Sequence, residues 1–186
     1  MKFKAFLLSL ALGAALLSGC SPKQAPETKE PQQQEQQNQQ EDQAEVVTTP
    51  SIVNNADAFL NAVGSEGTWI IATLNDITID KDIVLEGEFT NKDQPARKIA
   101  LYEQDADRNV TARYTLTAPK LIVRSENARI QSGTFVGDVY VEAKGFQLVD
   151  TKLEGNLYFA NDELKASATI DEKSSVTGVT EIKQAQ

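Results

Sequence analysis

Apolar residues in the second half of the chain recur at a spacing of about 18 residues, and this period constrains the fold more than any other feature. When the sequence is shifted against itself, Leu121 falls on Val139 and then on Leu157. Apolar residues within each repeat also come in pairs two positions apart, such as Val139 and Val141, which is the spacing of a strand with one buried face. Such units cannot bury an apolar face alone, so the period predicts that they stack on one another.

The same shift aligns further apolar residues and glycines, whereas the residues between them vary freely. The aligned sets are Val123, Val141 and Phe159; Ala128, Phe146 and Leu164; Ile130, Leu148 and Ala166; Phe135 and Leu153; and Gly137 and Gly155. A left-handed coil of hexapeptides would need a shorter repeat, but Leu121, Asn127 and Gly133 differ in type. The period therefore predicts an all-β fold, a short right-handed parallel β-helix with rungs of about 18 residues.

One short helix is predicted before the strands. Asn55 is a typical N-cap, Gly64 is a typical helix end, and the apolar residues between them have helical spacing. These apolar residues are Ala56, Phe59, Leu60 and Val63. The sequence therefore predicts an amphipathic helix over residues 55–63, and it predicts strands after that helix.

The residues between this helix and the repeat are predicted to form strands over 69–74, 77–79, 83–85, 99–102 and 110–116. An earlier and tighter rung is expected here, with inward side chains at Ile77, Ile79, Ile83, Leu85 and Phe89. Residues 90–117 do not fit the period, so we expect a longer excursion there, with a hairpin turn in the stretch EQDADRN (103–109). After a register slip of one residue at Ile170, the coil is expected to close through Val176, Val179 and Ile182.

The only cysteine of the chain, Cys20, follows a segment with the features of a secretory signal peptide. Lys2 and Lys4 are positively charged, and residues 6–17 form an apolar run that is short for a membrane span. The stretch LSGC, residues 17–20, is similar to the lipobox of bacterial lipoproteins at every position. The resemblance implies that the Cys20 thiol carries a diacylglycerol, that cleavage precedes it, and that the new amino terminus receives an acyl group such as palmitate. The alternatives are an ordinary buried cysteine or an uncleaved signal anchor.

Residues 21–50 have the composition of a tether. The segment is rich in Gln and Glu, has no aromatic residue, and contains Pro22, Pro26, Pro31 and Pro50. Such a segment cannot bury enough apolar surface to offset the entropy of ordering it, so we expect disorder. A Gln-rich coiled coil is the alternative, although no apolar heptad supports it. The expected organisation is a signal peptide over 1–19, the lipidated cysteine and tether over 20–50, and a β-helix domain over 51–186.

Two stretches resemble known β-helix families. The predicted helix followed by GTWIIATLNDITIDKDIVLEGEF (67–89) resembles the N-terminal cap and first rung of pectin-lyase-like right-handed β-helices. The stretch SGTFVGDVYVEAKGFQLVDTKLEGNLYF (132–159) resembles the bactofilin-like, polymer-forming β-helices, with their recurrent turns of Gly, Asp or Asn and an apolar residue. The first resemblance implies that the helix plugs the open N-terminal end of the coil. The second implies a capacity for self-assembly.

Composition excludes several kinds of chemistry. The formal net charge of −9 makes a nucleic-acid partner unfavourable, and the chain has no histidine and no second cysteine. We expect no cofactor, no metal site and no catalytic residues. Asp138 and Asn156 align in the repeat but are read as stacked turn residues, and the loop 105–109 lacks the Gly and Glu of a calcium loop. Asp162 and Glu163 are interpreted as turn residues.

Tyr140 and Tyr158 occupy the same phase of the repeat, between inward residues, and are predicted to stack on the outer surface. An exposed aromatic ladder of this kind can bind sugar rings or a protein, and it can equally be a cross-strand pair that only stabilises the sheet. The basic residues Arg113, Arg124 and Arg129 lie nearby in the sequence, with the same two interpretations.

These observations favour a non-catalytic cell-envelope lipoprotein, held by its lipid on the extracytoplasmic face of a cell membrane or on an outer membrane. Its β-helix would act as a scaffold or a binding surface for a cell-wall glycan or another envelope protein. One alternative is a bactofilin-like self-assembling polymer, which would make the chain a homo-oligomer. A further alternative is a polysaccharide-active β-helix enzyme, which would need close carboxylates in a groove.

Overall fold

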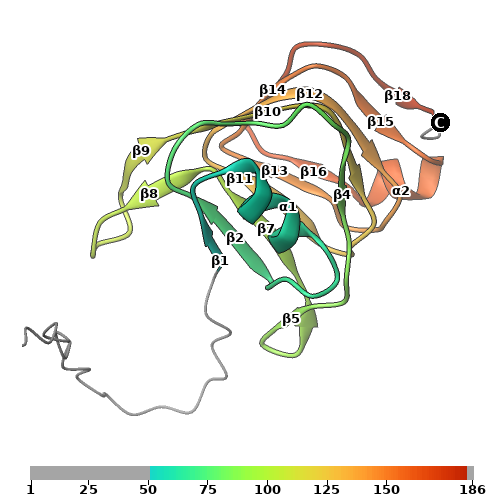
Figure 1. Ribbon diagram of the computed structural model, residues 1–186. Coiled ribbons are helices and arrows are strands. Elements are labelled where there is room, and N and C mark those ends of the chain that lie inside the picture. The colour runs from blue at the N-terminus through green and yellow to red at the C-terminus, as the bar shows by residue number, and fades with distance from the viewer. Residues whose placement is uncertain (1–50, 184–186) are drawn as a thin grey trace, which may run out of the picture. The chain divides into compact units, whose positions relative to one another are not determined.

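The computed structural model describes residues 51–183. The predicted signal peptide, Cys20 and the tether lie outside the described residues. The described part is mostly β, with two large sheets built from parallel strands and two short helices, α1 (Ala56–Val63) and α2 (Asp162–Ser167) (Figure 1). Two small antiparallel hairpins project from this framework. The prediction of a mostly β fold is therefore confirmed, and so is that of the helix near its start; strand β1 precedes that helix, and α2 is an additional helix.

The first sheet, here called sheet A, contains short strands that lie side by side in the order in which they occur along the chain. Every pair of neighbours in it is parallel. Its strands, in spatial order, are β1 (Ser51–Val53), β2 (Ile70–Thr73), β7 (Arg97–Ala100), β11 (Ala128–Gln131), β13 (Gln147–Val149) and β16 (Thr169–Ile170).

The second sheet, sheet B, is centred on two longer strands, β10 (Thr115–Val123) and β12 (Thr134–Val141). All its pairings are parallel too, with β3 and β4 beside β10, β14 and β15 beside β12, and β17 and β18 outermost. The short strands are β3 (Ile77–Thr78), β4 (Ile83–Leu85), β14 (Lys152–Glu154), β15 (Leu157–Phe159), β17 (Ser175–Val176) and β18 (Thr180–Ile182).

The predicted 18-residue alignment is the observed pairing register in the middle of both sheets. Leu121 pairs with Val139 and Val139 with Leu157 in sheet B, while Ile130 pairs with Leu148 in sheet A. The chain passes alternately from one sheet to the other, so each strand lies beside the strand one repeat away. Parallel pairing at a constant offset follows directly, because equivalent residues of successive repeats are placed side by side.

Glycine is required at the aligned positions Gly137, within β12, and Gly155, between β14 and β15. Their φ angles are +137° and +157°, in a region that residues with a Cβ rarely adopt. A Cβ on Gly155 would also overlap the carbonyl oxygen of Gly137 in the neighbouring strand. The glycine alignment therefore marks a place where the backbones of successive repeats approach closely.

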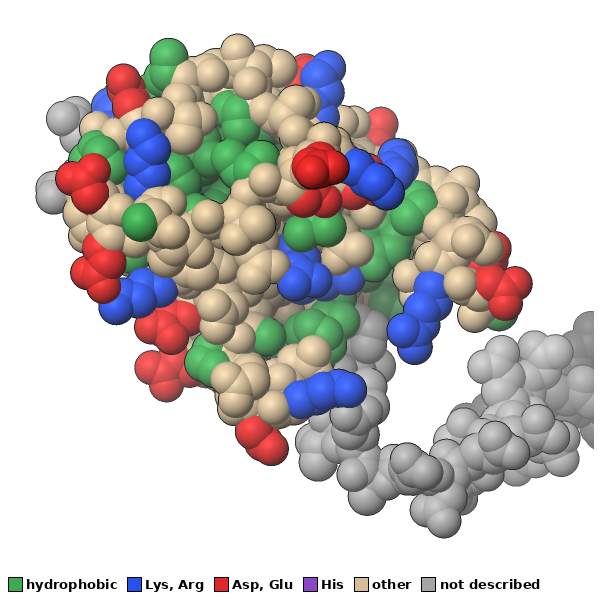
Figure 2. Space-filling view, turned by 180° about the vertical axis from the view of Figure 1, so that it is seen from behind, with side chains coloured by type: hydrophobic (Ala, Val, Ile, Leu, Met, Phe, Trp, Pro, Cys, Tyr) green, Lys and Arg blue, Asp and Glu red, His purple; other side chains and the backbone are tan. Residues whose placement is uncertain are grey.

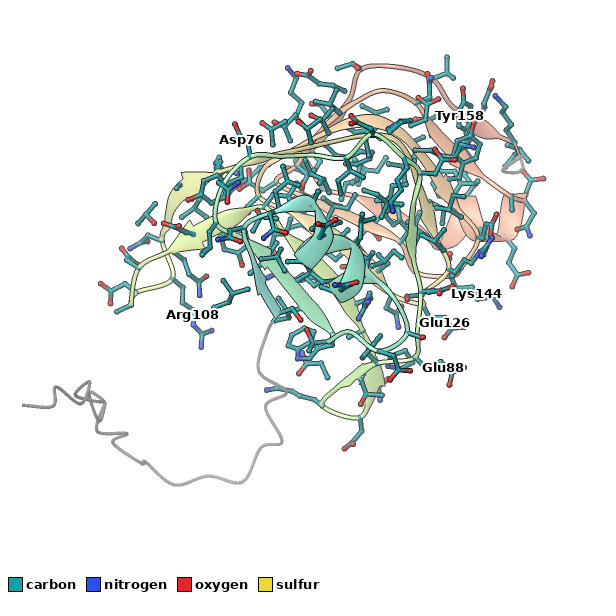
Figure 3. The ribbon with its side chains drawn as sticks, in the orientation of Figure 1. Asp76, Glu88, Arg108, Glu126, Lys144 and Tyr158 are labelled. Carbon is teal, nitrogen blue, oxygen red and sulfur yellow. The ribbon has the colours of Figure 1, made fainter. Side chains whose placement is uncertain are left out.

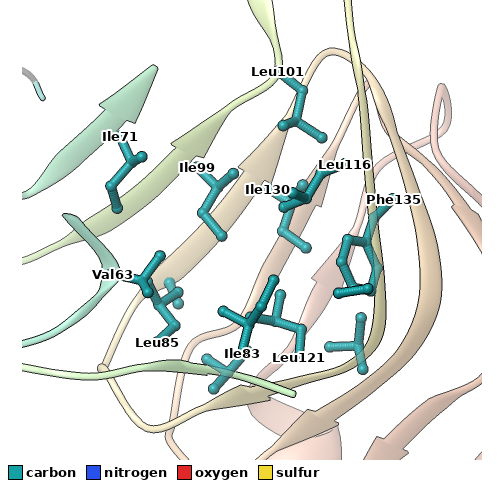
Figure 4. Close-up of a cluster of buried hydrophobic side chains, with 14 of the residues drawn as sticks. Val63, Ile71, Ile83, Leu85, Ile99, Leu101, Leu116, Leu121, Ile130 and Phe135 are labelled. Carbon is teal, nitrogen blue, oxygen red and sulfur yellow. The ribbon is translucent and has the colours of Figure 1, made fainter. Parts of the chain in front are cut away.

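The space between the two sheets is filled by the inward side chains of both (Figure 4). The buried aliphatic and aromatic residues of this core include Ile71, Ile83, Leu85, Ile99, Leu101, Leu116, Leu121, Ile130, Phe135, Val139, Val141, Leu148, Leu153 and Leu157. Their alternation with outward residues is the two-residue spacing seen in the sequence. Phe89 is an exception to the predicted inward set, because it is only partly buried and lies under the Arg97 guanidinium, 3.9 Å from ring centroid to Cζ.

Helix α1 has the predicted start and end and covers the N-terminal part of the core. The Asn55 side chain accepts a hydrogen bond from the Ala58 amide at 2.9 Å, which caps the first turn. Its buried residues are Phe59, Ala62 and Val63, and the helix packs against β1, β2 and β4.

Arg97 joins the end of this helix to sheet A. Its Nη2 donates to the carbonyl oxygens of Ala62 (2.8 Å) and Gly64 (3.0 Å), and its Nη1 donates to that of Thr68. The residue is buried, and desolvation lowers the pKa of its guanidinium to about 10. The guanidinium thus supplies donors to carbonyl groups at the end of α1 and in the turn that follows it.

Residues 90–117 contain the predicted excursion, with more regular structure than expected. One hairpin pairs β5 (Thr90–Asn91) with β6 (Gln94–Pro95), and a second pairs β8 (Tyr102–Gln104) with β9 (Val110–Arg113). The turn of the second hairpin falls in the predicted stretch, at residues 105–109. Between the hairpins, β7 returns to sheet A, so this region contributes a strand to the ladder instead of leaving it.

The prediction for the last repeat is wrong. Asp162 and Glu163, read as turn residues, form the first turn of α2, and the Asn161 side chain caps the helix by accepting from the Leu164 amide at 2.9 Å. Because the helix occupies extra chain length, Leu148 pairs with Ile170 and not with Ala166, so the register moves by more than the predicted single residue. Leu164 is still buried, as its alignment with Phe146 predicts.

Candidate functional site

Tyr140 and Tyr158, the predicted binding surface, lie side by side on the outer face of sheet B. They are register partners in β12 and β15, and their ring centroids are 4.8 Å apart at an angle of 40°. Stacking is therefore confirmed. The predicted exposure is wrong, because only 7% of Tyr140 and 6% of Tyr158 is accessible to solvent.

Neighbouring side chains explain why these outward rings are covered. The two tyrosines form a second small apolar cluster with Ile122 and the partly buried Val84. The ammonium group of Lys183 lies 4.5 Å from the centroid of the Tyr158 ring, and that of Lys120 lies 5.3 Å from the centroid of the Tyr140 ring. The pair is therefore a stabilising cross-strand contact with little ring surface left for a ligand.

One surface hollow, about 780 Å³, lies between the β5–β6 hairpin and the turns that follow β10 and β12. We call it the Glu126 hollow. It is lined by Gly87, Glu88, Phe89, Thr90, Pro95, Arg124, Ser125, Glu126, Glu142, Ala143, Lys144 and Leu164. Figure 3 shows Glu88, Glu126 and Lys144 along one side of the molecule.

The cations of the Glu126 hollow are neutralised by carboxylates. Arg124 Nε lies 2.9 Å from a Glu142 oxygen, and Lys144 Nζ lies 2.6 Å from a Glu163 oxygen. The hydrogen bond from Lys144 lowers the pKa of the Glu163 carboxyl, and the same bond raises the pKa of the Lys144 ammonium. These pairs join neighbouring repeats, and they leave the hollow with both signs of charge and no arrangement of two facing carboxylates fixed by contacts.

The smaller hollow, about 340 Å³, lies over sheet A beside the β5–β6 hairpin. We call it the Trp69 hollow. It is lined by Trp69, Asn91, Gln94, Pro95, Ala96, Arg97, Lys98, Asn127, Arg129 and Gln147. None of these residues is acidic, although acidic side chains outnumber basic ones in the chain by 27 to 18.

Two cations lie next to each other in the Trp69 hollow. Lys98 in β7 and Arg129 in β11 are register partners, on the outward phase of sheet A. Arg129 donates from Nε and Nη2 to the side-chain oxygen of Gln147, at 2.9 and 2.6 Å, and Lys98 Nζ donates to the Tyr102 hydroxyl at 2.8 Å. Within residues 51–183 both cations are thus held by neutral groups.

Other predicted polar features are structural contacts. The Asn156 backbone and side-chain amides both donate to one Asp138 oxygen, at 2.9 and 2.8 Å, and the Val179 amide donates to the Asn156 side chain at 3.0 Å. This is the stacked turn that the alignment predicted. Among the described residues no group of three or more potential metal-ligating side chains gathers.

The loop 105–109 satisfies its own polar groups. The Asp105 carboxylate accepts from the Asp107 and Asn109 amides and from the Asn109 side chain, and these hydrogen bonds, led by that of the Asn109 side chain, lower the pKa of Asp105. The tip of the hairpin carries Arg108, which projects to one side (Figure 3). The loop is thus an ordinary hairpin turn, as predicted.

The three arginines that lie close in the sequence do not gather in space around one partner. Arg113 binds the Asp150 carboxylate at 2.6 Å, Arg124 binds Glu142, and Arg129 binds Gln147. On the face shown in Figure 2, acidic and basic side chains are likewise interspersed. The Trp69 hollow could not be found from these arginines alone, because its members come from separate passes of the chain.

Neither a family model, nor a curated protein, nor a solved structure matches this chain. Over residues 51–183, neither helix has the length and apolar character needed to cross a membrane. The proposed function therefore rests on the sequence patterns and on the contacts just described.

Proposed function

We propose that the protein is a lipid-anchored lipoprotein of the cell envelope, whose folded domain is a non-catalytic β-helix that serves as a scaffold or binding surface. The observation that carries this proposal is the stretch LSGC at residues 17–20, placed directly after a short apolar run with Lys2 and Lys4 before it. Acyl chains on Cys20 would hold the protein at a membrane, since each buried CH₂ contributes about 0.8 kcal/mol.

The β-helix interpretation rests on the constant offset between paired strands. Parallel partners recur along both sheets, and the chain alternates between the sheets as it advances. A right-handed coil is the connection that parallel strands in one sheet strongly prefer. A rigid rod of this kind presents its outer faces to partners while its core remains closed.

A non-catalytic role is supported by how the polar groups are used. The chain lacks histidine, the commonest general base, and the two cations that line the Glu126 hollow are each paired with a glutamate. Asp138, the most regularly placed carboxylate of the repeat, accepts two hydrogen bonds from Asn156. These groups stabilise the stacking of the repeats, so a structural or binding role accounts for them without a reaction.

Self-assembly through both ends of the coil is the less favoured alternative. An end-to-end polymer needs two open ends, but α1 covers the core at the N-terminal end with three buried residues and with the Arg97 cap. The bactofilin-like alternative therefore requires α1 to leave its place.

Metabolic labelling with an alkyne analogue of palmitate tests the anchor. We expect label on the wild-type protein and its recovery in the membrane fraction. Cys20→Ala should lose the label and remain in the soluble or unprocessed precursor fraction. Ser21→Ala, which changes the neighbouring residue outside the motif, is the matched control and should behave as wild type. An unlabelled wild-type protein, or equal labelling of Cys20→Ala, would overturn the proposal.

A further inference from the structure

The Trp69 hollow is electropositive in an acidic protein. Its lining includes Arg97, Lys98 and Arg129 and no carboxylate, whereas the whole chain has a formal net charge of −9. In the Glu126 hollow, by contrast, each of the two cations is paired with a glutamate. A concave surface of one sign concentrates ions of the opposite sign, so the Trp69 hollow favours an anion.

The placement of Lys98 opposite Arg129 is unfavourable without such a partner. Like charges on directly opposed residues of neighbouring strands destabilise a sheet. The described residues relieve this through neutral groups, the Gln147 oxygen for Arg129 and the hydroxyl and ring of Tyr102 for Lys98. These contacts also hold the two cations in place, so an arriving anion would find donors that are already oriented.

The rest of the lining has the chemistry of a sugar site. Trp69, the only tryptophan of the chain, is partly exposed and supplies a large flat apolar surface. The lining also holds four amide side chains, whose remaining groups can donate to or accept from hydroxyl groups; the Asn127 nitrogen already donates to the Pro95 carbonyl oxygen and the Gln147 oxygen accepts from Arg129. These amides are Asn91, Gln94, Asn127 and Gln147. An aromatic platform with amides around it fits a polyhydroxylated ring better than it fits an inorganic ion.

We propose that the Trp69 hollow binds an anionic sugar, with the ring against Trp69 and the anionic substituent at Lys98 and Arg129. The inference deepens the proposed function, on which it rests for the envelope setting, by assigning a site and a ligand class to the binding surface. A uronic-acid carboxylate and a sugar phosphate share the required chemistry, since either accepts hydrogen bonds from an ammonium and a guanidinium. The volume of about 340 Å³ accommodates one or two sugar rings.

Arg97 has a different role from Lys98 and Arg129. It lies on the inward phase of β7, and its guanidinium is committed to the carbonyl oxygens at the end of α1. Its positive charge adds to the field of the hollow, and its one donor without a partner among the described residues, Nε, is buried. For this reason a substitution of Arg97 would disturb the end of α1 and would not be a specific test of ligand binding.

Tryptophan fluorescence of the full-length protein in detergent micelles provides the measurement, because Trp69 is the only tryptophan. The probes are a hexuronate trisaccharide, glucose 6-phosphate, the neutral trisaccharide maltotriose and inorganic phosphate. We expect saturable changes with at least one of the two anionic sugars, and the stronger of the two identifies the source of the negative charge. Raising the ionic strength should weaken the binding.

Variants separate this site from the rest of the surface. Lys98→Gln and Arg129→Gln should each weaken binding of the anionic sugar by about tenfold or more, as expected for loss of a charge-assisted hydrogen bond. Arg124→Gln in the Glu126 hollow is the matched control and should bind as wild type. A thermal melt of each variant checks folding. If Arg129→Gln fails to fold, the more conservative Arg129→Lys replaces it.

Three outcomes would overturn the inference: no saturable change with either anionic sugar, equal affinity for maltotriose, or inorganic phosphate binding as tightly as the sugars. Unchanged affinity in both Lys98→Gln and Arg129→Gln would also overturn it. Titration of the Cys20→Ala protein distinguishes this failure from failure of the anchor. A protein that binds the sugar but carries no lipid contradicts only the proposed envelope function.

Discussion

The two ends of the folded domain differ in how completely they cover the core. At the N-terminal end, α1 contributes Phe59, with no solvent-accessible surface, together with buried Ala62 and Val63. At the C-terminal end the last strands leave apolar residues in solvent, and 42% of Ile170 and 42% of Ile182 is exposed. The core between the two sheets is therefore covered at the N-terminal end and only partly covered at the C-terminal end.

The difference shows what is needed to close such an end. Helix α2 also lies near the C-terminal end, but Leu164 is its only buried residue, and in the described part of the chain the side-chain bond to its last turn is a local one, from the Ser167 hydroxyl to the Leu164 carbonyl oxygen at 2.8 Å. Apolar burial per residue is thus much greater around α1 than around α2. Because local opening is easiest where few apolar side chains are buried, the C-terminal strands should open before the N-terminal ones.

Removal of the Phe59 ring, at the N-terminal end, should cause the largest loss of stability. Phe59→Ala leaves a cavity under α1 where the side chain is fully buried, so we expect the free energy of unfolding to fall by about 3–5 kcal/mol. Urea denaturation of the full-length protein, followed by circular dichroism, measures this. A loss below about 1 kcal/mol would contradict the view that α1 closes the core.

Arg97→Lys should have the next largest effect. Lysine keeps the charge but lacks the planar fork that lets Arg97 donate to Ala62, Gly64 and Thr68 together. Loss of these hydrogen bonds is expected to lower the free energy of unfolding by about 2 kcal/mol. Arg124→Lys, in an exposed ion pair, is the matched control and should lower it by less than about 0.5 kcal/mol. Equal losses in the two variants would show that the cap adds no stability.

Ile182→Ala tests the open end and should have a small effect. Ile182, in the outermost strand, pairs with Phe159, but 42% of the residue is exposed to solvent. We therefore expect a loss below about 1 kcal/mol in the same urea denaturation. A loss as large as that of Phe59→Ala would mean that the C-terminal end is covered in solution, for instance by a second copy of the chain.

The sequence predicted features whose causes are close together along the chain. Asn55 and the spacing of Phe59 and Val63 suffice for α1, because a cap and an apolar face are local properties. The offset of Leu121 and Val139 suffices for the register of the central strands, since each repeat packs on the next one. The same local pattern starts α2, where Asn161 precedes two acidic residues, but short polar stretches of this kind are equally typical of turns.

The features that were missed depend on contacts between distant residues. Alternation predicts that Tyr158 points outward, but the lysine that covers it, Lys183, belongs to the following repeat. The Trp69 hollow combines a residue before the first hairpin with others from three later strands and turns, and the β5–β6 hairpin interrupts the period on which the alignment depends. An alignment of repeats identifies which residues of neighbouring repeats lie side by side. It cannot identify the contacts that an inserted segment makes with those repeats.

The smallest loss of stability is expected from a change in the turn between β16 and β17, and this loss depends on pH. The Asp171 carboxylate accepts hydrogen bonds from the Ser174 hydroxyl at 2.6 Å and from the Asp150 amide at 3.0 Å. These bonds, the Ser174 hydroxyl first, lower the pKa of Asp171 below its ordinary value of 3.8. The ionised form is therefore favoured in the folded protein. Its stabilising contribution is fully present above pH 3.8 and is lost as the pH falls through the lowered pKa.

Asp171→Asn should remove this contribution and leave the rest of the acid sensitivity unchanged. We expect the thermal midpoint of the variant to lie slightly below that of wild type at pH 7, with the difference shrinking toward zero as the pH falls well below 3.8. Glu172→Gln changes the next residue, an exposed carboxylate, and serves as the control for net charge. Hydrogen exchange locates the effect, because the amides of β16 and β17 should exchange faster in Asp171→Asn while those of β1 and β2 do not change. Faster exchange at the N-terminal strands would show that the two ends open together, and the stability difference between them would then have to be abandoned.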